Sequence, residues 1–186
     1  RAGTPGSVMA LLTWLHQAGC LSEDAEPWQR WEEWFVEIEE SHTSLPILSF
    51  FRSPQPGRSW VTAAGVILDT LALLTSAVAL PASAHRDACF KAGCVALAHV
   101  HRFFTEQLHL RPSPHLPHGH HPATDEPRRP DFDAALAQLA AAGLPPCPDA
   151  DAAWQHYQAL RQHYSQALLF LAQITVAPDG KPLINP

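Results

Sequence analysis

The chain has few charged residues for its length, and basic residues are the scarcer kind. Only 16% of its 186 residues are charged, with 12 Lys and Arg against 18 Asp and Glu, so the formal net charge is −6. A nucleic-acid interface needs a stripe rich in Lys and Arg, and a helix lying on an anionic membrane needs a basic cluster. The composition argues against both, and no nucleic-acid partner is expected.

Cysteine is sparse as well, and its copies are scattered. The four residues are Cys20, Cys89, Cys94 and Cys147, and no two of them form a Cys-x-x-Cys pair. This spacing is typical of reduced thiols in a cytosolic protein, not of a disulfide framework or a zinc site.

The sequence lacks the fingerprints of common enzymes. It contains no Gly-x-Ser-x-Gly motif, no P-loop and no dinucleotide-binding glycine pattern. No stretch is typical of a strand, turn and second strand. We therefore expect no catalytic residues and no cofactor.

What the chain does contain is helical periodicity, with 46% hydrophobic residues to build a core. We expect an all-α fold, a single helical bundle of about five or six helices over residues 1–186. Residues 60–80 are apolar on almost every side, which predicts a buried central helix. The run 61–82 is about long enough to cross a membrane, since about 20 residues suffice. Asp69 in its middle would cost on the order of 3 kcal/mol there, which favours the core of a soluble bundle.

An aromatic stripe marks the helix that begins near Pro27. Trp28, Trp31, Trp34, Phe35 and Ile38 fall on one side at steps of three and four. Such a stripe is most often a packing face. A ligand-binding box and a surface for a protein partner are the alternatives.

Residues 112–130 are rich in proline and histidine and almost free of apolar side chains. Such a composition cannot offset the entropy of ordering, so we expect a disordered loop. Its histidines can bind metal ions, but nothing in the loop fixes a geometry for a specific site. They are His115, His118, His120 and His121.

Two Glu-x-x-His steps suggest a second metal alternative. They are Glu39 to His42 and Glu106 to His109. Di-iron helical bundles use two such steps, with a further Glu from each of two other helices. Those further carboxylates are missing here, so a metal-dependent enzyme stays an alternative and no metal is the main expectation.

Three ionisable residues stand where a core requires them to be paired: His42, Arg52 and Asp69. An unpaired buried charge is very unfavourable, so Asp69 needs a cation. Arg52 follows two phenylalanines and is predicted to turn inward. We expect an Arg52–Asp69 ion pair that acts as a structural clamp, because no nucleophile or oxyanion donor accompanies it.

The segment around these residues resembles the intracellular C-terminal region of a bacterial family of two-transmembrane, ion-channel-like proteins of the potassium channel family. In that family a Trp-rich helix ends in Glu-Ser-His, and a proline, an aromatic pair with Arg-Ser, Ser-Trp and a Leu-Asp helix follow. The matching residues are Glu40-Ser41-His42, Pro46, Phe50-Phe51-Arg52-Ser53, Ser59-Trp60 and Leu68-Asp69. The resemblance covers roughly residues 28–104.

The resemblance implies a non-enzymatic assembly or regulatory domain on the cytoplasmic side of the cell membrane. Its expected partner is its own upstream transmembrane pore module, in a homo-oligomer. The resemblance implies that this module precedes the chain, and the start at Arg1 instead of Met agrees. The chain itself has no selectivity-filter segment with which to conduct. A di-metal enzyme and a soluble interaction scaffold are the alternatives.

Overall fold

The computed structural model describes residues 7–21, 26–50, 59–111 and 127–175, and it confirms the all-α prediction. The α-helices are α1 (Val8–Gln17), α2 (Glu26–Ser44), α3 (Trp60–Ala77), α4 (Ala84–Arg102), α5 (Arg129–Ala141), α6 (Ala150–Gln162) and α7 (Ser165–Thr175). A 3₁₀-helix, η1 (Pro46–Phe50), follows α2, and a π-helical turn, η2 (Phe103–Gln107), extends α4. Among the described residues, the only strand-like pairing is an isolated bridge between Val78 and Pro146.

Polar side chains fix several helix starts. Ser59 and Ser83 each accept a hydrogen bond from a backbone N–H in the first turn of α3 and α4. Asp149 does the same for α6 by accepting from two amides. These contacts satisfy N–H groups that have no partner inside the helix.

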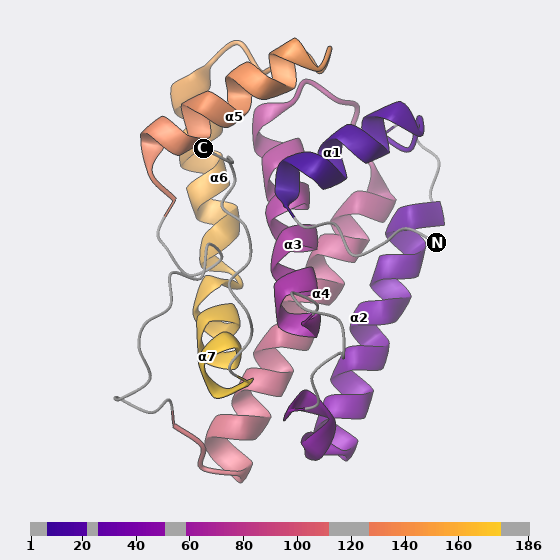
Figure 1. Cartoon of the computed structure of the whole chain (residues 1–186), viewed down its shortest axis with the longest axis vertical. Coiled ribbons are helices and arrows are strands. Elements are labelled where there is room, and N and C mark those ends of the chain that lie inside the picture. Colours follow the sequence, from indigo (N-terminus) through magenta and orange to yellow (C-terminus); the bar gives the residue numbers. More distant parts are fainter. Residues whose placement is uncertain (1–6, 22–25, 51–58, 112–126, 176–186) are drawn as a thin grey trace.

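The central position predicted for α3 is confirmed (Figure 1). Helices α1, α4, α6 and α7 all pack against it, and 83% of its residues are buried. Among the described helices only α3 is long and apolar enough to cross a membrane by length and composition. Burial of this kind is equally typical of the core helix of a bundle.

Helices α2 and α4 run side by side and form the most extensive helix pair (Figure 1). A β-carbon on Gly93 of α4 would lie 2.8 Å from Leu68 of α3 and from Phe35 of α2. The missing side chain therefore lets three helices approach one another. Trp28 and Phe35 are buried in the same cluster, and Trp31 and Trp34 pack against it. The stripe is thus a packing face, as expected.

The helical stretch at the C-terminal end is divided into α6 and α7. The amides of His163 and Tyr164 bond to the carbonyls of Leu160 and Arg161, three residues back. This tightening to 3₁₀ geometry ends α6, and α7 begins at Ser165. The break between α6 and α7 lies beside Asp69, and it orients side chains toward that carboxylate.

Candidate functional site

The buried carboxylate of Asp69 is the centre of a polar cluster inside the bundle. Arg161 Nη1 lies 2.9 Å from Asp69 Oδ1, and Tyr164 donates its hydroxyl to the same oxygen at 2.5 Å. Arg161 also donates to Tyr157 Oη at 3.4 Å, and its guanidinium lies against the Tyr157 ring. All four side chains are almost completely buried.

The helix break explains how two residues three apart reach one oxygen. In an α-helix, residues i and i+3 differ in direction, whereas in a 3₁₀ turn they are eclipsed. The tightened turn at the end of α6 therefore aligns Arg161 and Tyr164 toward α3. Asp69 therefore binds Arg161 in the last turn of α6 and Tyr164 just before α7 through the same carboxylate oxygen.

Burial raises the pKa of Asp69, while Arg161 and Tyr164 oppose that rise by stabilising the carboxylate. Burial alone would lower the pKa of Arg161, but the Asp69 carboxylate raises it above its ordinary value. A neutral Asp69 would leave a buried guanidinium without its anion, so we assign the charged pair. Burial and the Asp69 charge raise the pKa of Tyr164, which keeps its hydroxyl a donor.

The sequence analysis expected a cation at Asp69 but named Arg52. Arg52 lies outside the described residues, so the expected Arg52–Asp69 contact is not among the contacts described. The guanidinium found against Asp69 is that of Arg161, 92 positions further along the chain. Tyr157 and Tyr164 are seven residues apart, and the Arg161 between them was the signal that sequence reasoning missed.

His42, the third residue of the expected clamp, belongs to a different place. Its ring packs on Trp60 at the start of α3, with 4.5 Å between centroids. Trp60 and Asp69 are nine residues apart, or about 13 Å along the helix axis. His42 Nδ1 lies 2.9 Å from the Ile38 carbonyl oxygen and 2.9 Å from Ser41 Oγ. Burial lowers the pKa of His42, so the imidazole is neutral at pH 7.

Trp60 continues the connection from His42 to η1. Its indole N–H donates to the Ser49 carbonyl at 3.4 Å. The ring of Phe50 in turn meets Phe104 of η2 edge-on, at 5.8 Å between centroids. The end of α2, η1, the start of α3 and η2 are therefore joined at one corner of the bundle.

Most of η1 and the residue before it form an exposed surface at this corner, which we call the apolar turn. Its members are Leu45, Ile47, Leu48 and Phe50, and the exposed fractions of Leu45 and Ile47 are 58% and 61%. Such a group of large apolar side chains in solvent is characteristic of a contact surface.

The metal alternatives find no assembled site. Across residues 7–21, 26–50, 59–111 and 127–175, no three His, Cys, Asp or Glu side chains are grouped to hold an ion. Glu39 bonds instead to His99 Nδ1 of α4, and His42 faces Trp60. Glu106 and His109 lie in and just after η2. His115, His118, His120 and His121 are outside the described residues.

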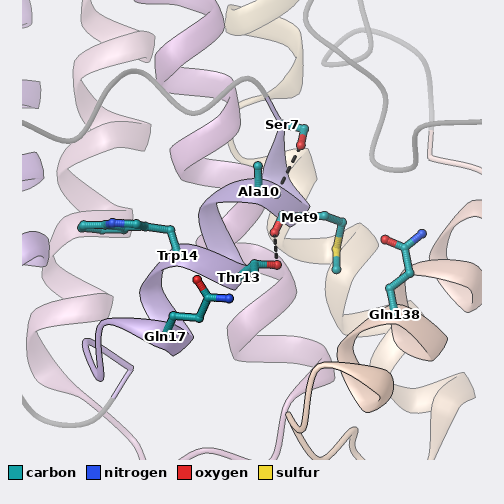
Figure 2. A pocket seen from close by; sticks show the side chains of 7 residues that line it. All are labelled: Ser7, Met9, Ala10, Thr13, Trp14, Gln17 and Gln138. Atoms are coloured by element: carbon teal, nitrogen blue, oxygen red, sulfur yellow. Dashed lines mark hydrogen bonds between the residues drawn. The ribbon is translucent and has the colours of Figure 1, made fainter.

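A hollow of about 530 Å³ lies between α1 and α5 (Figure 2). Gln138 from α5 lines it with side chains of α1, among them Met9 and Thr13. The hydroxyl of Thr13 is already engaged by the Met9 carbonyl. None of the lining residues titrates near neutral pH, so the hollow offers no acid or base for catalysis.

No family model matches the chain, and no curated protein or solved structure is significantly similar to it.

Proposed function

We propose that this chain is a non-enzymatic helical domain that assembles or regulates a bacterial ion-channel-like membrane protein from its cytoplasmic side. The single observation that carries the proposal is that several described residues of the family-like motif meet at one corner, while Asp69 lies in the core. His42 meets Trp60, and Trp60 bonds to η1, although His42 and Trp60 are 18 residues apart in sequence. These contacts support a common structural role for His42, Trp60 and η1.

The chemistry of the motif supports a structural and contact role for this corner. The Ser59 hydroxyl caps α3, and the neutral His42 ring serves as a packing surface for Trp60. The motif's Asp69 is neutralised inside the core by Arg161. What these residues leave for solvent is the apolar turn, which suits contact with another protein segment better than contact with a small polar substrate.

In this proposal the subunits associate through the upstream pore module, and the helical domain responds to or reports on that association. The partner of the domain is thus part of its own polypeptide or assembly. Ion conduction belongs to the pore module, and the domain alters how readily the pore opens.

A flux measurement tests the proposal. The longer natural protein is reconstituted in liposomes loaded with potassium, with and without residues 1–186, and efflux and oligomeric mass are measured. We expect loss of the domain to change the efflux rate or the subunit number. A matched version carrying Gln138→Ala, far from the corner, should behave as the intact protein.

Two outcomes would overturn the proposal. One is an upstream sequence without a pair of membrane-spanning helices around a pore loop. The other is identical efflux and mass with and without the domain.

A further inference from the structure

A line of carboxylates runs along α2 toward the apolar turn. Glu33, Glu37 and Glu40 are spaced four and three apart, so they lie on one face of the helix, and all three are exposed. We call them the acidic stripe. Val36, 47% exposed, lies within one helical turn of each.

These carboxylates have no recorded ion-pair partner among the described residues. Elsewhere on α2, Glu26 pairs with Arg30, and Glu39 pairs with His99. Within the part of the chain that the structure describes, the acidic stripe thus presents three carboxylates without an ion pair next to the exposed side chain of Val36. Glu40 is only five residues before Leu45, where the apolar turn begins.

From this juxtaposition we infer that the acidic stripe and the apolar turn together bind a basic amphipathic segment of a protein partner. The inference rests on the proposed function and names the partner's chemistry. Leucine-like side chains of the segment cover the apolar turn, and its Lys or Arg side chains lie along α2.

The charge decides against two other occupants. If two copies of the chain met through their apolar turns about a twofold axis, the same surface from each would face the other, and the two acidic stripes would approach with like charge. An anionic membrane is repelled for the same reason, and the chain as a whole carries −6. A cationic protein segment meets no such repulsion, because its charge is opposite to that of the acidic stripe.

A binding assay with the 186-residue chain tests the inference. The probe is a fluorescent 18-residue helical peptide of Lys and Leu with one apolar face, and fluorescence anisotropy reports its binding. Its matched control has Glu at every Lys position. We expect the Lys peptide to bind and the Glu peptide not to bind, with affinity falling as salt is raised from low to physiological ionic strength.

Variants separate the two halves of the surface. Glu33→Gln with Glu37→Gln and Glu40→Gln should weaken binding about tenfold, as loss of three modest ion pairs predicts. Ile47→Asn with Leu48→Asn should weaken it by about tenfold or more, since the apolar anchors are lost. Asp133→Asn, an exposed ion-paired carboxylate on α5 and outside the proposed surface, is the matched control and should bind as the parent chain. Far-UV circular dichroism establishes that each variant is folded.

Each remaining outcome contradicts the inference. Equal weakening by Asp133→Asn would show attraction to net charge alone. Unchanged binding by the Ile47 and Leu48 variant would remove the apolar turn from the surface. A dimer in solution that this variant dissociates would assign the turn to a second copy, and sedimentation with phosphatidylserine vesicles would assign it to a membrane. None of these results depends on potassium flux, so the inference and the proposed function fail separately.

Discussion

Asp69 and Arg161 form a buried ion pair that joins the central helix to the end of α6, with 2.9 Å between Oδ1 and Nη1. Removing one partner leaves the other as an isolated buried charge. Asp69→Ala is therefore expected to lower the free energy of unfolding by about 3–5 kcal/mol. Urea denaturation followed by circular dichroism measures this. The double variant Asp69→Leu with Arg161→Met should recover most of the loss, because neither charge then remains.

Tyr164 supplies the second bond to the Asp69 carboxylate. Tyr164→Phe removes a hydrogen bond to a charged acceptor and is expected to cost about 1.5–3 kcal/mol of unfolding free energy. Tyr157→Phe is the matched control, because its hydroxyl only accepts a long bond of 3.4 Å from Arg161. If both variants cost the same in urea denaturation, the short contact to Asp69 contributes nothing specific.

Gly93 is enclosed by side chains of α2 and α3. Gly93→Ala would gain about 1 kcal/mol from helix propensity but lose about 1–3 kcal/mol from overpacking. The new β-carbon would lie 2.8 Å from atoms of the buried Phe35 and Leu68, so we expect net destabilisation. Thermal unfolding measures it. Ala98→Gly, on an exposed position of the same helix, separates backbone effects from packing and should cost only the propensity difference.

His42 makes stability depend on pH. Burial lowers its pKa in the folded protein below the ordinary value of 6.5, so the unfolded chain binds more protons as pH falls through 6.5. Stability from the neutral imidazole is thus complete above pH 6.5 and is lost as pH falls toward the folded pKa. His101, whose pKa burial also lowers, acts in the same direction.

Urea denaturation at pH 7.5 and pH 5.5 measures this dependence. We expect the parent chain to be less stable at pH 5.5, and His42→Asn to lose a smaller amount between the two values. An equal or larger loss in the variant would mean that His42 does not titrate as its burial requires.

Burial also suppresses the reactivity of two thiols. It raises the pKa of Cys89 and of Cys94 to about 12, so almost no thiolate is present at pH 8. In the folded protein we expect iodoacetamide to leave both unmodified for hours, while all four cysteines react in urea. Peptide mass spectrometry reads each site, and rapid labelling of Cys89 in the folded chain would contradict its buried position.

The sequence predicts most of the fold because the relevant signals are local. The apolar circumference of residues 60–80, the Ser59 cap and the aromatic steps from Trp28 to Ile38 each fit within a few helical turns. Periodicity and capping depend on neighbours in the chain, so they can be read without coordinates. The buried central helix and the packing role of the tryptophans were predicted on that basis.

The candidate site depended on contacts between residues that are far apart in the sequence. That Asp69 requires a cation follows from its position in an apolar helix, and the sequence determined that much. Which cation it meets depended on how α6 lies against α3 and on a break that turns Arg161 and Tyr164 to one side. Likewise, chain order placed Glu40 close to Leu45, but only packing brought His42 onto Trp60 and left the apolar turn exposed. Burial creates the demand for a partner locally, whereas the partner's identity is a property of chain segments that meet only in the folded bundle.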